Sequence, residues 1–287
     1  MDVNSGHTFP ITDHHMHLDH RCQGTEAAKA FKRAGGTHIF LVSKPSWTIG
    51  VTINQPDDYR LVFNETVEMA KAVQEIGVTA FPVLGVHPAA ITRMYGRVGL
   101  DRTIELMRSG LEIAAGYVEE GLAVGLKSGR PHYKVEPALW DASNDILAYA
   151  MELAREAGCP VQLHTETATP EGIGELAGMA RTAGLSPENV VKHFSPPMIP
   201  EFAQCGIWPG VLAGKGMIEE ALAQGDRFMM ETDYIDDPQR PGAVLGVRTI
   251  PRKTLALVDT WGDEVFWKIH KENPEKVYHI EIERTTT

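Results

Sequence analysis

Short apolar runs and longer amphipathic segments alternate along the whole chain. The apolar runs have the length of buried strands, and the segments between them repeat apolar residues at helical spacing. We expect strands at residues 9–16, 37–45, 78–88, 121–133, 159–166, 189–195, 207–214 and 227–236. We expect helices at residues 25–34, 59–76, 100–120 and 139–158, from 170 onward, and at 198–206, 216–225 and 253–277.

This alternation predicts a parallel sheet that is covered by helices. Eight strand–helix units in 287 residues favour an α/β fold of the closed (β/α)8 TIM barrel type. An open doubly wound sheet is the alternative, but the Gly-rich phosphate-binding motif of such folds is missing after the first strand. Because no low-complexity linker or short-period repeat interrupts the chain, we expect residues 1–287 to form one domain.

Candidate metal ligands fall at the carboxyl ends of the expected strands. They are His15, His17, Lys127, His164, His193 and Asp233. In a TIM barrel these strand ends meet at one mouth, where active sites are built. His15 and His17 are two positions apart, so both rings face the same side of the first strand. Core histidines tied by hydrogen bonds would explain one or two of these positions, whereas a metal centre explains the whole set.

The position of Lys127 in the fourth expected strand indicates which way its side chain points. It shares one face of its strand with Ala123 and Gly125, while Leu122, Val124 and Leu126 occupy the other face. Small residues suit a crowded barrel interior, so we expect Lys127 to point inward. Burial lowers the proton affinity of an amine, and the neutral amine could react with carbon dioxide to form a carbamate that bridges two metals. The alternatives are a lysine that binds an anionic substrate and one that reaches solvent.

Asp233 and four further residues are expected to support the chemistry. Asp233 could ligate one metal and accept a proton from the attacking water, although a loop hydrogen bond is the alternative. Asp13 is expected to bond a ligand imidazole, and Glu166 is expected to orient a ligand or the water if its strand continues. His87 and His132 are open between substrate contact and a structural role.

A basic cluster follows the last expected strand. Arg240, Arg248, Arg252 and Lys253 lie in this loop region. Near the mouth of a barrel, Arg248 and Arg252 could receive a phosphate or a carboxylate of the substrate. Solvated loop charge is an equally open interpretation.

The charge and cysteine content limit the classes of protein. The formal net charge of -11 argues against tight, non-specific nucleic-acid binding. None of the three cysteines belongs to a CxxC motif, and this cysteine content is typical of a protein in a reducing cytosol. Residues 1–10 do not read as a secretory signal, and no run approaches the ~18 apolar residues of a membrane span. We therefore expect a cytoplasmic protein without membrane partners.

Several short motifs resemble those of a known protein family and occur in the same order. DHHMHLD at 13–19 resembles the opening Asp-x-His-x-His-x-Asp motif of the TatD-like metal-dependent hydrolases, within the amidohydrolase superfamily. GVHP, QLH, KHFS and ETD, which end at positions 88, 164, 195 and 233, look like the later motifs of this family in the same order. The segment GGTHIFLVSKPSW looks closer to an archaeal branch.

The resemblance implies a barrel hydrolase with one or two divalent metals. It implies that His15 and His17 bind one metal together with Asp233, and that His164 and His193 bind the other. The family pattern has a bridging glutamate in strand four, but here no carboxylate lies between Glu120 and Glu136.

Lys127 instead makes the site resemble the phosphotriesterase-like amidohydrolases, whose bridge is a carboxylated lysine. This departure weakens the expectation of the DNase activity that some TatD proteins have. A single-metal site without a bridge is the alternative.

These observations lead to one main hypothesis and two alternatives. We expect a metal-dependent hydrolase that acts on a phosphoester or a nucleic acid. The alternatives are hydrolysis of an amide, lactone or carboxylic ester, and a non-catalytic metal-bearing binding protein. The nitrogen-rich ligands favour zinc, with manganese, iron or cobalt as alternatives. The substrate would be a small molecule or a phosphoester, and the oligomeric state does not follow from the sequence.

Overall fold

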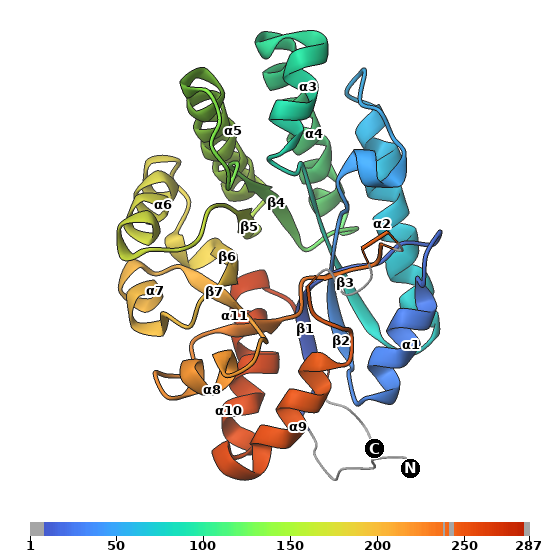
Figure 1. Ribbon diagram of the computed structural model, residues 1–287, viewed down its shortest axis with the longest axis vertical. Helices are drawn as coiled ribbons and strands as arrows, with labels where there is room; N and C mark the ends of the chain where they lie inside the picture. The colour runs from blue at the N-terminus through green and yellow to red at the C-terminus, as the bar shows by residue number, and fades with distance from the viewer. Residues whose placement is uncertain (1–8, 238, 241–243, 284–287) are drawn as a thin grey trace.

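Nine strands form one sheet in the computed structural model, and all hydrogen-bonded neighbours run parallel (Figure 1). The structure describes residues 9–237, 239–240 and 244–283. Residues 1–8 lie outside this range. They make up most of the segment 1–10, for which we expected no secretory signal. The strands are β1 (Thr12–His17), β2 (His38–Val42), β3 (Thr79–Gly85), β4 (Gly125–Gly129), β5 (Val161–His164), β6 (Val190–Ser195), β7 (Trp208–Leu212), β8 (Met229–Glu231) and β9 (Tyr234–Ile235).

The eighth strand is split, and its two parts close the barrel. β8 pairs with β7, whereas β9 pairs with β1. Only Thr232 and Asp233 separate the two parts, and Asp233 has a left-handed backbone with φ of 46°. The expected TIM barrel is therefore confirmed. The expectation of one continuous strand at 227–236 is wrong, because the left-handed residue breaks the extended backbone.

Helices pack against the sheet, and those from α1 to α8 follow one another around it in sequence order (Figure 1). They are α1 (Thr25–Arg33), α2 (Asp58–Glu75), α3 (Ala90–Val98), α4 (Leu100–Glu119), α5 (Pro137–Glu156), α6 (Pro170–Thr182), α7 (Ile199–Cys205), α8 (Met217–Leu222), α9 (Thr249–Trp261), α10 (Asp263–Trp267) and α11 (Asn273–Tyr278). Short helical turns are η1 (Ser46–Ile49), η2 (Pro187–Asn189) and η3 (Lys268–Glu272). Within the described residues, no helix is both long and apolar enough to cross a membrane.

Two helical regions differ from the expectation. Helix α3 was not predicted. It buries Ile91 and Met94, which pack in the outer core, the part of the hydrophobic core between the sheet and the surrounding helices. The single helix expected at 253–277 is broken after α9 by Gly262, whose φ of 83° favours glycine. The chain then turns back through α10, η3 and α11.

The core lies on both faces of the sheet. On β2, Ile39 and Leu41 pack with helices α1 and α2, whereas Phe40 packs inside the barrel. Tyr278 of α11 joins this inner cluster with Trp208, the first residue of β7. These large side chains fill the floor of the barrel, so polar side chains gather at the opposite, carboxyl ends of the strands.

Two glycines bring β3, β4 and β5 close together at the mouth. A Cβ added at Gly85, the last residue of β3, would lie 1.9 Å from the carbonyl oxygen of Lys127. A Cβ added at Gly129, the last residue of β4, would lie 1.8 Å from the carbonyl oxygen of His164. No side chain fits at these distances, so both glycines are needed where Lys127 and His164 enter the mouth.

Candidate metal centre

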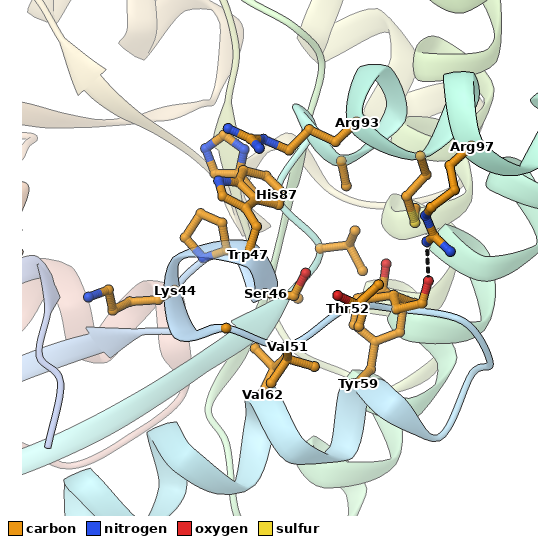
Figure 2. Close-up of a pocket in the computed structure, with 17 residues that line it drawn as sticks. Lys44, Ser46, Trp47, Val51, Thr52, Tyr59, Val62, His87, Arg93 and Arg97 are labelled. Atoms are coloured by element: carbon orange, nitrogen blue, oxygen red, sulfur yellow. Dashed lines mark hydrogen bonds between the residues drawn. The ribbon is translucent and has the colours of Figure 1, made fainter. Parts of the chain in front are cut away.

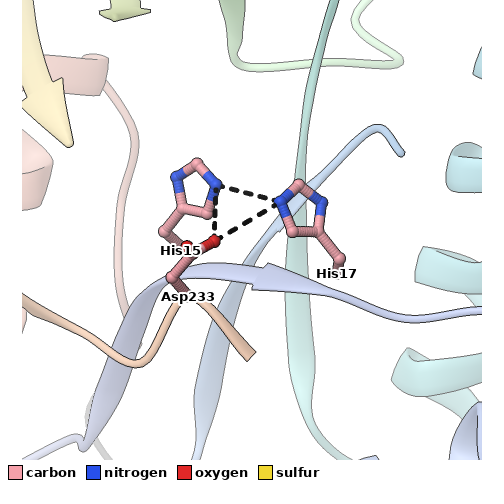
Figure 3. Close-up of side chains that lie close together, drawn as sticks. All are labelled: His15, His17 and Asp233. Atoms are coloured by element: carbon pink, nitrogen blue, oxygen red, sulfur yellow. Dashed lines mark hydrogen bonds and ion pairs between the residues drawn. The ribbon is translucent and has the colours of Figure 1, made fainter. Parts of the chain in front are cut away.

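The first pair of histidines lies at the end of β1. The Nε2 atoms of His15 and His17 are 3.2 Å apart, and both side chains are buried. The Oδ1 atom of Asp233 lies 3.6 Å from each of these nitrogens. Figure 3 shows the three side chains converging on one point. They form a group whose ligand atoms are close enough together to hold one metal ion.

The second pair lies beside the first. His164, at the end of β5, places its Nδ1 atom 2.9 Å from Nε2 of His193 on β6. The rings of His15 and His193 stack with centroids 4.1 Å apart. The barrel therefore brings all four histidines into one continuous cluster.

Lys127 points into this cluster, as expected. Its Nζ atom lies 3.1 Å from Nε2 of His15, and the residue is only 2% exposed. Burial lowers the pKa of the Lys127 amine to about 8. Leu126 packs with the outer core, also as expected. Ala123 and Val124 take the reverse orientation, outer and inner respectively, because β4 begins only at Gly125.

Two partners orient the ring nitrogens of the cluster. His17 donates from Nδ1 to the carbonyl oxygen of Val42 at 2.8 Å, which leaves the Nε2 lone pair facing His15. His193 places Nδ1 3.3 Å from Oε1 of Glu231, which accepts the ring proton. Sequence reasoning missed Glu231 as a supporting residue. Its position two residues before Asp233 in an expected strand was the available signal.

The protonation states fit a metal site. Burial is the main cause that lowers the pKa of all four imidazoles well below 6.5, so they are neutral, the form that binds metals. Burial also raises the pKa of Asp233 to about 6. Nδ1 of His15 and Oε2 of Glu231 are buried without a hydrogen-bond partner among the described residues. A second possible ligand group combines His15, His193 and Glu231. These donors fit divalent metal ions.

Asp13 supports the barrel closure and does not bond an imidazole. Its Oδ2 atom accepts the hydroxyl of Thr232 at 2.6 Å, and its Oδ1 atom accepts the backbone N–H groups of Thr232 and His15. The expected bond to a ligand imidazole is therefore wrong. A register irregularity in β1 between Asp13 and Met16 turns Asp13 away from the face of the histidines.

Glu166 is held by a buried arginine. β5 ends at His164, so the strand does not continue as far as Glu166. The guanidinium of Arg130 donates to Glu166 and to Glu175, and it stacks over Trp140 at 4.7 Å. The expectation that Glu166 orients a ligand or the water is not met, because its carboxylate is directed to Arg130 after the strand ends.

His87 and His132 lie at the edge of the cluster. Nδ1 of His132 is 2.9 Å from Nε2 of His164. The ring centroid of His87 is 4.5 Å from that of His164 and 5.8 Å from that of Trp47. Both histidines line a cavity of about 260 Å³ together with His17, Lys127 and Asp233. Their position suits contact with a substrate.

The basic cluster separates into two places. Arg240 lines the cavity over the histidines. Arg248 immediately precedes α9 and Arg252 lies in its first turn, and both line a groove beside Ala30 of α1. The expectation that Arg248 and Arg252 face the substrate is wrong, because the start of α9 directs them toward the outer surface. Arg240, which belongs to the same basic cluster, is the arginine of that cluster that lines the cavity.

Comparison with known proteins adds the family. The sequence model of a family described as TatD related DNase matches residues 12–279. An uncharacterized protein of Methanocaldococcus jannaschii is 38% identical over 282 residues, which is 96% of this chain and 98% of the relative.

Similar solved structures have the same fold. A TatD-like protein from Archaeoglobus fulgidus has a TM-score of 0.62 at 18% identity, covering 93% of this chain and 100% of that chain. The organophosphorus hydrolase from Deinococcus radiodurans has a TM-score of 0.59 at 16% identity, covering 94% and 92%. The phosphotriesterase homology protein from Escherichia coli, solved with phosphate in its active site, has a TM-score of 0.61 at 12% identity, covering 94% and 98%. The family match, over nearly the whole chain, shows that the protein belongs to the TatD-related family of metal-dependent hydrolases.

Proposed function

We propose that this protein hydrolyses a phosphoester at a centre of two divalent metal ions, with zinc as the favoured metal. The observation that carries the proposal is the meeting of four neutral imidazoles, one lysine and one aspartate at the mouth of the barrel. His15, His17 and Asp233 would hold one ion, and His164 and His193 would hold the other.

Bound metal ions would supply Lewis acidity, which activates water and polarises the scissile phosphoryl group. The side chains then have separate tasks. Asp233 lies at the open side of the His15–His17 pair and is a constituent of the cavity wall. Its carboxylate would accept the proton that the attacking water loses. His132 and Arg240 line the same cavity and would contact the substrate.

We further propose that Lys127 carries a carbamate that bridges the two ions. The lowered pKa leaves a large share of the amine neutral near pH 8, and only the neutral amine reacts with carbon dioxide. The reaction joins the amine nitrogen to the carbon of carbon dioxide and releases one proton. The oxygen ligands that form would replace the carboxylate that strand four lacks.

A phosphoester is favoured as substrate because two of the similar structures are an organophosphorus hydrolase and a phosphotriesterase homology protein with bound phosphate. The cationic side chains in the cavity over the histidines, Lys44 and Arg240, are each paired with a carboxylate, that of Asp19 and that of Asp237 respectively. A small molecule suits the net charge of -11 better than a nucleic-acid polymer does.

Substitution of Asp233 by Asn tests the proposal. We expect the purified Asp233→Asn protein to retain metal but to lose hydrolysis of bis(4-nitrophenyl) phosphate by about 10²- to 10⁴-fold. Asp101→Asn, a matched change in the first turn of α4, should leave the rate unchanged. Parallel assays with 4-nitrophenyl acetate distinguish the carboxylic-ester alternative. Hydrolysis of the acetate alone would overturn the phosphoester assignment. Unchanged biological activity in Asp233→Asn would support a non-catalytic binding protein.

A further inference from the structure

A second cavity lies beside the metal centre, between the segment after β2 and helix α3. It has a volume of about 270 Å³. Figure 2 shows the side chains around it, with Trp47 and His87 on one side and Tyr59 and Val62 on the other. Its wall combines polar atoms with apolar side chains of the outer core, including Ile53, Val86 and Met94. The apolar part of the wall suits a compact apolar group, and the polar part suits a charged or hydrogen-bonding substituent on that group.

The charged residues around this cavity are all cationic. They are Lys44, Arg93 and Arg97, and none of the described lining residues is a carboxylate. Lys44 is already paired with Asp19, and Arg97 donates to Asn54. Arg93 stacks over Trp47 at 4.5 Å and has no carboxylate partner among the described residues. In a chain with a net charge of -11, this leaves one arginine ready to receive an anion.

The second cavity adjoins the cavity over the metal centre. Lys44, Pro45, Trp47 and His87 line both this cavity and the one over the histidines. His87 also contacts His164, which belongs to the metal cluster, with a ring separation of 4.5 Å. A ligand that occupied both cavities would lie beside Trp47 and His87, with one end near the metal cluster and the other near Arg93.

We propose that this second cavity is the specificity pocket of the enzyme and that it binds a compact apolar group carrying an anionic substituent, which Arg93 holds. The inference rests on the proposed function, because it makes the substrate a phosphoester with such a group as one of its arms. Stacking on Trp47 fixes the plane of the Arg93 guanidinium, and a carboxylate or phosphate oxygen would then accept its N–H donors.

Binding of phenylphosphonate to the metal-free protein tests the pocket apart from catalysis. Isothermal titration and tryptophan fluorescence would measure the dissociation constant after chelation of metals. We expect Arg93→Gln to weaken binding by about 10- to 100-fold, the effect of one charge-assisted hydrogen bond. Ala90→Leu adds bulk to the wall and should weaken binding to a similar extent. Arg102→Gln, the same charge change outside the cavity on α4, should have no effect.

The outcomes separate this inference from the proposed function. Benzyltrimethylammonium, an aromatic cation of similar size, should not bind. Two results would contradict the proposed pocket. One is equal binding of the cation and of phenylphosphonate, and the other is phenylphosphonate binding that requires metal and is unchanged in Arg93→Gln. If Asp233→Asn abolishes phosphoester hydrolysis while phenylphosphonate fails to bind, only this inference falls. If phenylphosphonate binds as expected but no phosphoester is hydrolysed, the pocket is supported and the proposed reaction is contradicted.

Discussion

The ring nitrogens of the candidate centre are oriented by hydrogen bonds to neighbouring groups. The Val42 carbonyl orients His17, and Glu231 orients His193 while also accepting the backbone N–H of Phe194 at 2.6 Å. Phe194 has a left-handed backbone, with φ of 54°, which is rare for a bulky residue. At the residue scale, backbone strain and partner placement direct the imidazole lone pairs inward.

Lys127 provides a direct prediction at this scale. Intact mass of the metal-loaded protein in bicarbonate buffer should show an adduct with the mass of one carbon dioxide, because the buried amine has its pKa lowered to about 8. Lys127→Ala should lose the adduct and about one metal per chain, since the bridging oxygens are gone.

Lys192 is a matched control for this experiment. It is also buried, with a pKa lowered to about 8, but its Nζ donates to the carbonyl oxygen of His193 at 2.6 Å and not toward His15. Lys192→Met should therefore keep the adduct. An adduct that persists in Lys127→Ala would refute the carbamate and assign Lys127 to the substrate.

At the scale of elements, the ends of β3, β4 and β5 are pressed together by glycine. Gly85 faces the Lys127 carbonyl so closely that even a methyl group would displace β4. This packing sets how far Lys127 stands from the histidines, and it makes the strand ends a rigid frame for the site.

Gly85→Ala should therefore destabilise the protein by at least about 3 kcal/mol and reduce metal content, because the new Cβ would push the strand that carries Lys127. Urea unfolding with parallel metal analysis would measure both effects. Gly116→Ala is the control: this helical glycine of α4 has no neighbour within 4 Å of an added Cβ. It should stabilise by about 0.5–1 kcal/mol. Equal effects of the two substitutions would contradict the close-packed frame.

Regular elements were predictable from the sequence, and irregular ones were not. Periodicity correctly indicated parallel strands alternating with helices, and it placed Lys127 on the inward face. It failed at the irregularity in β1, which redirects Asp13, and at the left-handed Asp233, which splits the last strand. It also failed for Arg248, because the exact start of α9 decides which way that side chain points. Such local breaks depend on tertiary contacts that a sequence period does not contain.

At the scale of the whole molecule, buried histidines link stability to pH. His270 joins the C-terminal region to β1: its Nδ1 atom lies 3.2 Å from the backbone N of Thr12, and its Nε2 atom lies 2.9 Å from the hydroxyl of Thr254. Burial lowers the pKa of His270 from 6.5 to about 3. Below about pH 6.5 this histidine binds a proton in the unfolded chain but not in the native protein. The free energy of unfolding therefore falls as the pH falls.

The metal-free protein should consequently lose stability between about pH 7.5 and about pH 5, with His270 contributing about 2 kcal/mol of that loss. Urea unfolding at both pH values would measure the free energy. His270→Gln cannot take up the proton, so its loss between the two pH values should be smaller by that amount. An identical pH dependence of both proteins would show that His270 does not carry this linkage.

The clustered histidines, Lys127 and Asp233 are proposed to bind divalent metal ions. Metal analysis of the purified protein, and of the protein reconstituted with zinc, tests whether they do. We expect about two ions per chain in the wild type and about one in His193→Ala, which removes a ligand of the second ion only. If neither preparation contains specifically bound metal, the cluster is no metal centre but a set of packed polar side chains at the mouth of the barrel.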